Sequence, residues 1–322
     1  MIKVSELRKQ FGPKHAVKGV SFTVEKGEVL GFLGPNGAGK STTMRMLTGF
    51  LPPTSGTASV GGFDVWENPI PAKRLLGYLP ENAPVYTDMT VEGFLRFAAE
   101  LRGMRGASVT QAVHRVIETC FLENVVQQSV DTLSKGYRHR TCFAQSILHD
   151  PEVLVLDEPT DGLDPNQKHE VRTLIRRMGE KKAIIFSTHI LEEVEAVCSR
   201  AMIIDRGEVV ANGTPSELKK RSEFAGTVLF KVAGPAPADV LAKAGSVAGA
   251  KRVVPFGANG EAGVRIYPQT SLADGQMTRA LHELANREGW QILELHQDEG
   301  RLDEVFRSIT LPDTQMQKDR QA

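Results

Sequence analysis

The 322-residue chain has few cysteines, no excess charge of either sign and no long hydrophobic run. Its three cysteines, Cys120, Cys142 and Cys198, share no metal-ligand spacing, which favours reduced packing residues over a metal site. Lys plus Arg and Asp plus Glu both number 39, so no basic field points to nucleic acid as a partner. No apolar run approaches the roughly 18 residues of a membrane helix, and MIKVSELRKQ lacks a signal-peptide core. The sequence therefore predicts a soluble chain that would need a membrane-spanning partner to act at a membrane.

The most informative segment is GPNGAGKST, residues 34–42, which matches the phosphate-binding pattern G-x-x-x-x-G-K-[ST]. It lies between the strand-like run EVLGFL and the helix-like run TTMRMLTG, the context that the pattern requires. Lys40 would contact the outer phosphates, and Ser41 would offer its hydroxyl to Mg²⁺. The alternative is a glycine-rich turn without a ligand. The expected nucleotide-binding residues are Gly34, Pro35, Asn36, Gly37, Ala38, Gly39, Lys40, Ser41 and Thr42.

Two further strand-like runs end in polar residues. VLVLDEP, residues 153–159, is typical of a central parallel strand buried on both faces, and its end would lie beside the phosphate loop. There Asp157 could hold Mg²⁺ through water, and Glu158 could orient the water that attacks the terminal phosphate. AIIFSTH, residues 183–189, ends in His189, which a neighbouring strand would aim at the same phosphate. The alternatives are exposed acids and a solvated histidine.

LSKGYRHR, residues 133–140, completes a set of motifs that resembles the ATP-binding subunits of ABC transporters, whose signature is close to LSGGQ. The resemblance covers about residues 1–220 and includes the motifs in their family order. It implies that Ser134 and Gly136 contact the γ-phosphate held by the phosphate loop of a second subunit, so that two ATP molecules are buried at a two-fold interface.

The same resemblance extends to two other positions. Phe11 corresponds to the aromatic residue that stacks on adenine, and an aromatic face recognises a base by stacking. Asp164, within TDGLD, belongs to the segment that crosses the dimer interface. Asp164, Pro165 and Gln167 also supply the N-cap, first-turn proline and capping-box partner of the helix that follows.

The chain departs from the family pattern at several motif positions. Glu81 replaces a common Gln, yet its carboxylate could still reach Mg²⁺ or the attacking water. Lys135 and Tyr137 replace Gly and Gln in the signature, and His139 stands where Gln is usual. Lys135 would favour an anionic γ-phosphate, so the variant signature is expected to be active. The segments GYLPE, GLDPNQ and LDEVFRSIT resemble the gliding-motility and multidrug branch of export-type subunits.

The predicted fold class is α/β, with a P-loop nucleotide-binding domain over residues 1–221. Strand-like pieces near the start predict a small antiparallel β subdomain, and residues 85–150 predict a helical subdomain. One helix should begin near Thr90, and another should run from Val109 to Cys120. The apolar face of the first comprises Val91, Phe94, Leu95, Ala98 and Leu101.

A small α+β domain is predicted over residues 222–309. Its β-α-β-β-α-β pattern suggests a ferredoxin-like fold, with one helix presenting an apolar face around Leu281. His282 and His296 have no partners at ligand spacing and are expected to be solvated surface residues. The polar stretch 310–322 is expected to be disordered. The chain has no internal repeat and a single phosphate loop, which excludes a pseudo-dimer within it.

The resemblance implies an ATP-hydrolysing motor subunit. Two copies would close around two Mg·ATP, and hydrolysis would reopen the pair. A separate integral membrane permease would convert the cycle into export, with the subunit peripheral on the cytoplasmic face of the cell membrane. The cargo contacts would lie in that permease. The alternative is a soluble regulatory ABC ATPase acting on ribosomes or nucleic acid, but such relatives typically carry two nucleotide domains or long coiled-coil insertions. A GTPase is disfavoured because the guanine motif N-K-x-D is missing.

Overall fold

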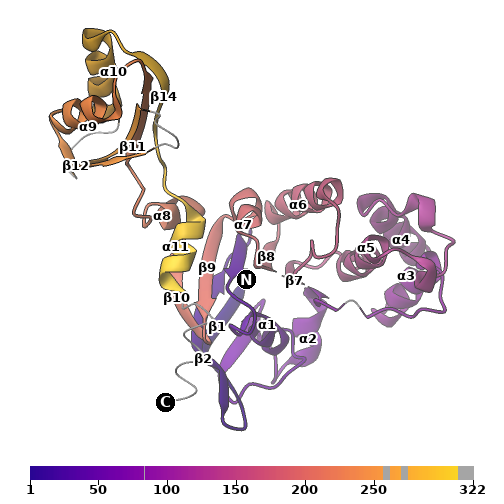
Figure 1. Ribbon diagram of the computed structural model, residues 1–322. Coiled ribbons are helices and arrows are strands. Elements are labelled where there is room, and N and C mark those ends of the chain that lie inside the picture. The colour runs from indigo at the N-terminus through magenta and orange to yellow at the C-terminus, as the bar shows by residue number, and fades with distance from the viewer. Residues whose placement is uncertain (83, 257–261, 270–274, 311–322) are drawn as a thin grey trace. The chain divides into compact units, whose positions relative to one another are not determined.

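The chain folds into two compact units, Met1–Pro215 and Ser216–Ile309 (Figure 1). The sequence placed this division near residue 222, whereas the second unit begins earlier, next to the start of the short helix α8 (Pro215–Lys219). Apart from Thr310, the predicted tail lies outside the described residues. The computed structural model describes residues 1–82, 84–256, 262–269 and 275–310.

The first unit contains the predicted antiparallel sheet, in the strand order β2-β1-β4-β5. β1 and β2 form a hairpin that turns at Gly12, whose positive φ of 53° suits a tight turn. Phe11 therefore pairs directly with Lys14 across the hairpin. The strands of this sheet are β1 (Ile2–Phe11), β2 (Lys14–Val24), β4 (Ser55–Val60) and β5 (Phe63–Asp64).

A mainly parallel sheet forms the centre of the first unit, in the order β10-β9-β3-β8-β7-β6. Every residue of β3, β7 and β8 is buried, as their continuous apolar sequences predict. These three strands are adjacent and parallel, so their carboxyl ends meet at one edge of the sheet, where open α/β sheets bind ligands. The strands are β3 (Val29–Leu33), β6 (Leu76–Leu79), β7 (Val153–Asp157), β8 (Ala183–Thr188), β9 (Arg200–Asp205) and β10 (Glu208–Gly213).

Helices flank the central sheet, and α3, α4 and α5 pack against one another as the helical subdomain (Figure 1). The start of α3 agrees with the sequence, because Thr90 Oγ1 accepts a hydrogen bond from the Gly93 N–H and caps the helix. Single 3-10 turns occur at Glu123–Val125 and Val130–Thr132. The helices of this unit are α1 (Lys40–Leu47), α2 (Pro69–Arg74), α3 (Val91–Leu101), α4 (Ala107–Thr119), α5 (Lys135–Ile147), α6 (Pro165–Gly179) and α7 (Leu191–Val197).

One residue of the apolar face predicted for α3 is not buried. Leu101 is 71% exposed, while the other predicted members are buried and Ala99 joins them. At about 100° per residue, Leu101 lies at one rim of the stripe and Ala99 at the opposite rim. Leu101 is also in the last turn of α3. The prediction was therefore wrong at the C-terminal end of the helix, where a small residue is buried in place of leucine.

From β11 to β14 the second unit follows the predicted order β-α-β-β-α-β, and the helix α11 comes after it. The strands form an antiparallel sheet, β12-β13-β11-β14, and alternate residues of β11 and β13 share a core with α9 and α10. Leu281 lies in this core. Assignment to the ferredoxin-like class stays a prediction. The elements are β11 (Val228–Ala233), α9 (Pro237–Gly245), β12 (Ala250–Pro255), β13 (Ala262–Pro268), α10 (Gln276–Glu288), β14 (Gln291–Gln297) and α11 (Leu302–Ile309).

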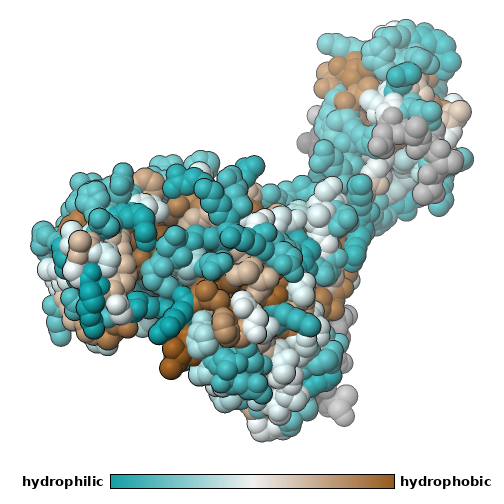
Figure 2. Space-filling model, turned by 180° about the vertical axis from the view of Figure 1, so that it is seen from behind, coloured by the Kyte–Doolittle hydropathy of each residue, from teal (hydrophilic) through white to brown (hydrophobic). Residues whose placement is uncertain are grey.

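The cysteines and the described helices have the properties that the composition predicted. Cys120, Cys142 and Cys198 are free and buried, as expected of packing residues. Burial raises the pKa of the Cys142 thiol to about 12, which keeps it protonated. None of the described helices has the length and apolar character needed to cross a membrane. Viewed from behind, the surface is largely hydrophilic, with hydrophobic side chains gathered in separate patches (Figure 2).

Candidate active site

The loop of residues 34–39 joins β3 to α1 in a conformation that depends on glycine. Gly37 and Gly39 have φ values of 79° and 110°, a region that side chains disfavour. At Gly34 a side chain has no room, because a Cβ there would lie 2.3 Å from the carbonyl oxygen of Ile204. The first N–H groups of a helix have no intrahelical partner, so the start of α1 offers donors and partial positive charge to an anion. The loop thus has the conformation and the N–H donors that a phosphate site requires.

Lys40 places a positive charge in this loop. Its Nζ donates hydrogen bonds to the carbonyl oxygens of Gly34, at 2.7 Å, and Pro35, at 3.2 Å. Burial lowers the pKa of Lys40, while the carboxylates of Glu158, Asp157 and Glu81 raise it. The ammonium is held by its own loop and faces a group of acids across the site.

Side-chain oxygen atoms that could bind a cation lie between α1 and the end of β7. Asp157 is fully buried, and its Oδ1 accepts hydrogen bonds from Ser187 Oγ, at 2.6 Å, and Ser41 Oγ, at 3.3 Å. Its Oδ2 is also buried and has no hydrogen-bond partner among the described residues. A buried carboxylate oxygen without a partner is costly unless a cation or water completes it. This donor set fits a hard divalent cation such as Mg²⁺, which prefers oxygen ligands.

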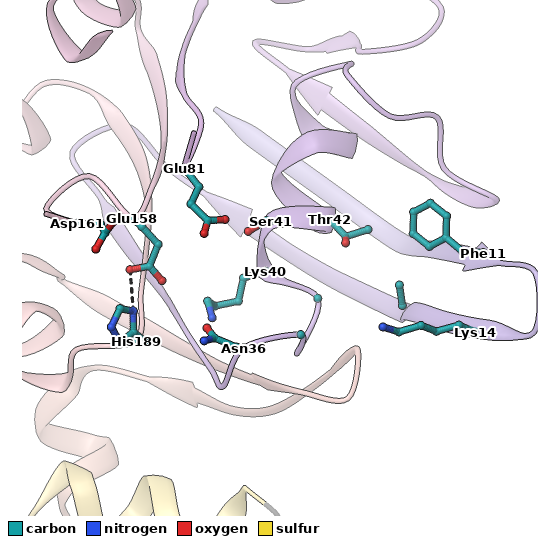
Figure 3. A pocket seen from close by; sticks show the side chains of 13 residues that line it. Phe11, Lys14, Asn36, Lys40, Ser41, Thr42, Glu81, Glu158, Asp161 and His189 are labelled. Carbon is teal, nitrogen blue, oxygen red and sulfur yellow. Dashed lines mark hydrogen bonds and ion pairs between the residues drawn. The ribbon is translucent and has the colours of Figure 1, made fainter. Parts of the chain in front are cut away.

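Glu158 and His189 meet at the ends of neighbouring strands. His189 Nδ1 lies 3.0 Å from Glu158 Oε2 (Figure 3). Glu158 has a φ of 50°, which is strained for a residue with a side chain, and its N–H donates to Ser187 Oγ at 3.0 Å. Burial raises the pKa of the Glu158 carboxyl, and the hydrogen bond to His189 opposes this. A raised pKa makes the carboxylate a better proton acceptor at neutral pH.

A cavity of about 440 Å³ joins these groups. Phe11 and Lys14 lie at one end, Glu158 and His189 lie at the other, and Lys40 lies between them (Figure 3). The predicted site residues that line the cavity are Phe11, Asn36, Gly37, Gly39, Lys40, Ser41, Thr42, Glu81, Glu158 and His189. The predicted residues beside it but outside its lining are Gly34, Pro35, Ala38 and Asp157.

The cavity also contains residues that the sequence analysis missed. Lys14, Ala16 and Asp161 line it. The sequence could have predicted the position of Lys14, because a tight turn at Gly12 places Lys14 opposite Phe11 on a hairpin. Asp161 lies in the turn after Glu158, where its N–H donates to the Glu158 carbonyl oxygen at 3.1 Å.

The signature residues do not line this cavity. Among the described residues that line it, none comes from 134–136. Ser134 caps α5 by accepting a hydrogen bond from the Tyr137 N–H at 3.3 Å. Lys135 Nζ pairs with Asp161 Oδ2 at 2.7 Å, and a Cβ on Gly136 would meet Gln167 Oε1 at 2.7 Å. Within one chain, the signature therefore reaches the cavity only through the contact of Lys135 with Asp161 among the described residues.

Two further predicted positions have local roles. Asp164 Oδ1 accepts from the Gln167 N–H at 2.9 Å, and Gln167 Oε1 accepts from the Asp164 N–H, which confirms the predicted capping box. His139 is buried, and neither ring nitrogen has a hydrogen-bond partner in the part of the chain that the structure describes. Burial lowers the pKa of His139 to about 4, so the ring is neutral at physiological pH.

The comparisons with known proteins agree with this geometry. A family model described as ABC transporter matches residues 17–161. The "Linearmycin resistance ATP-binding protein LnrL" of Bacillus subtilis is 35% identical over 222 residues, which are 69% of this chain and 71% of LnrL. The chain belongs to the ABC transporter family. This membership confirms the resemblance to export-type ATP-binding subunits that its motifs indicated.

Other members of the family match as well. The "Probable multidrug ABC transporter ATP-binding protein YbhF" of Escherichia coli is 40% identical over 223 residues, and the match spans only 38% of YbhF. The "Nod factor export ATP-binding protein I" of Burkholderia lata is 39% identical over 241 residues, 74% of this chain and 78% of that protein. A solved ATP-binding subunit of an ABC transporter is 29% identical, with a TM-score of 0.64, over 69% of this chain and 92% of that one.

Proposed function

We propose that this ABC transporter family member is a motor subunit that binds and hydrolyses ATP to drive export through a separate membrane permease. The observation that carries the proposal is the placement of Glu158 and His189, 3.0 Å apart, in the same cavity as Lys40. A base, a polar side chain beside it and a phosphate-binding lysine are the parts that phosphoryl transfer to water requires. The export character rests on the relatives named for multidrug transport and Nod factor export.

The hydrolysis step follows from these positions. ATP would lie with its base against Phe11 and its phosphates over the loop and Lys40. Glu158 accepts a proton from water as the water oxygen bonds to the γ-phosphorus, and the bond from that phosphorus to the ADP oxygen breaks. His189 orients the Glu158 carboxylate and contacts the terminal phosphate. Ser41 and Asp157 would hold Mg²⁺, with Glu81 within its water shell; when bound, the ion neutralises developing charge on the phosphates.

The working form in this proposal is a dimer of the chain. Lys40 and Glu158, to which the proposal assigns ATP binding and attack, line the cavity, while Ser134, Lys135 and Gly136 do not. A second copy would bring its signature to the γ-phosphate of the first, and Asp164 belongs to the segment expected to cross the interface. Lys135 would have to exchange its ion pair with Asp161 for the phosphate.

Mixing two inactive variants tests this shared site. We expect Lys40→Ala to lose ATP binding, and Ser134→Arg to block closure by placing bulk and charge at the γ-phosphate. A heterodimer of the two has one composite site built from intact halves, so an equal mixture should recover up to about a quarter of wild-type ATPase activity. Each variant alone is the control. Wild-type specific activity should also rise with concentration to a plateau, and a constant rate from a protein that light scattering finds monomeric during turnover would contradict shared sites.

The permease would hold the subunit at the cytoplasmic face of the membrane. The helical subdomain exposes apolar side chains suited to a partner, among them Tyr86, Leu101 and Phe121. We expect the protein to sediment with membranes only when its permease is co-expressed, and to remain in the supernatant without it. Binding to ribosomes or DNA that persists at physiological salt would instead support a regulatory ATPase.

A further inference from the structure

Glu193 is a buried carboxylate that the hydrolysis step does not use. It lies in the first turn of α7, with only 1% of the residue exposed. An ionised carboxylate at such depth is costly unless hydrogen bonds satisfy both oxygens. Both are satisfied here. Oε1 accepts a hydrogen bond from Thr160 Oγ1 at 2.6 Å, and Oε2 accepts one from Thr188 Oγ1 at 2.7 Å.

The two threonines belong to the segments that carry the reactive pair. Thr160 follows Glu158 by two residues, and Thr188 immediately precedes His189. Both hydroxyls are buried, and Thr188 Oγ1 also accepts a hydrogen bond from the Ile190 N–H at 3.0 Å. Since a hydroxyl has a single proton, donation to Glu193 fixes the orientation of each hydroxyl and links the residue that carries it to α7.

Contacts of this kind are needed because Glu158 and His189 both lie outside the helices and strands. Glu158 has the left-handed φ of 50°, which persists only where surrounding contacts enforce it. His189 lies beyond the end of β8, and the residue after it precedes α7. Two other hydrogen bonds join the two segments: the Glu158 N–H donates to Ser187 Oγ, and Glu158 Oε2 pairs with the half-exposed His189. The bridge through Glu193 is buried and joins the same two segments.

We infer that Glu193 is a positioning residue for ATP hydrolysis, which holds the Glu158 and His189 segments at the spacing that the attacking water requires. The inference rests on the proposed hydrolysis, and it assigns Glu193 no contact with ATP. Loss of the bridge should let the two segments separate while the phosphate loop, which Glu193 does not touch, keeps its affinity.

Removal of one hydroxyl at a time tests the inference. Thr160→Val and Thr188→Val keep the shape of the side chain and delete the hydrogen bond to Glu193. We expect each to lower kcat by about 10- to 100-fold, the effect of a misplaced catalytic group, with the Kd for ATP changed by less than about threefold. Thr160→Ser, which restores the hydroxyl without the methyl, should recover most of the lost kcat. Each rate is divided by the number of ATP-binding sites titrated in the same preparation, so that unfolded protein does not lower the measured kcat.

Thr141→Val is the matched control. Thr141 is also buried, but its hydroxyl donates to the Tyr137 carbonyl oxygen within α5, so its loss should leave kcat unchanged. Hydrogen–deuterium exchange gives a readout independent of turnover: residues 158–163 and 187–190 should exchange faster in the two bridge variants only. Wild-type turnover reports on the proposed function by itself. Wild-type kcat and exchange in both bridge variants, or equal losses of kcat and ATP affinity, would overturn the role of Glu193.

Discussion

Glu158→Gln is expected to lower kcat by about 100- to 10,000-fold while ATP binding is retained. Glutamine has the shape of glutamate, yet its amide cannot accept the proton of the attacking water. Because Glu158 is not among the groups that bind the phosphates, the Kd for ATP should remain close to that of the wild type. The variant should therefore accumulate as an ATP-bound dimer, which gel filtration with and without ATP would detect.

The matched control for this variant is Glu28→Gln. Glu28 is a half-buried glutamate that pairs with Arg200 Nε at 2.6 Å and does not line the cavity. Its substitution removes one carboxylate of similar burial, and we expect unchanged turnover. Wild-type ATP hydrolysis by Glu158→Gln would refute the assignment of Glu158 as the base.

Lys40→Ala should act on binding instead. The ammonium is buried, and phosphates would replace or share its present carbonyl partners. Loss of a buried charged hydrogen-bond donor costs about 2–4 kcal/mol, or about 30- to 1000-fold in affinity. Titration with a fluorescent ATP analogue would measure the change. Equal ATP affinities for Lys40→Ala and Glu158→Gln would contradict this division of labour.

Lys182→Ala separates the binding effect from general destabilisation. Lys182 is also largely buried, and its Nζ pairs with Asp150 Oδ1 at 2.6 Å, away from the residues that line the cavity. Its loss should lower the melting temperature of the apoprotein and leave the affinity for ATP unchanged. If both lysine variants lost ATP affinity to a similar extent, the loss in Lys40→Ala would be due to general destabilisation of the fold.

The parts predicted well are those whose causes are local in the sequence. Continuous apolar runs identified β3, β7 and β8, because parallel strands covered on both faces need no polar side. Asp164 and Thr90 marked helix starts, since a cap needs only the N–H groups two or three residues ahead. Leu101 was predicted wrongly because periodicity does not tell where the neighbouring helices stop covering a helix.

The sequence by itself determined that this protein has a nucleotide site, because the phosphate loop assembles from consecutive residues whose glycines and lysine are all within one segment. The tertiary structure alone decided how that site is completed. Glu158 meets His189 across 31 residues, Lys135 meets Asp161 across 26, and Glu193 meets Thr160 across 33. The first and third of these contacts exist because β7 and β8 lie side by side and bring the segments after them together. The second joins the start of α5 to the turn after β7. Periodicity within one segment does not predict how far apart two such segments lie.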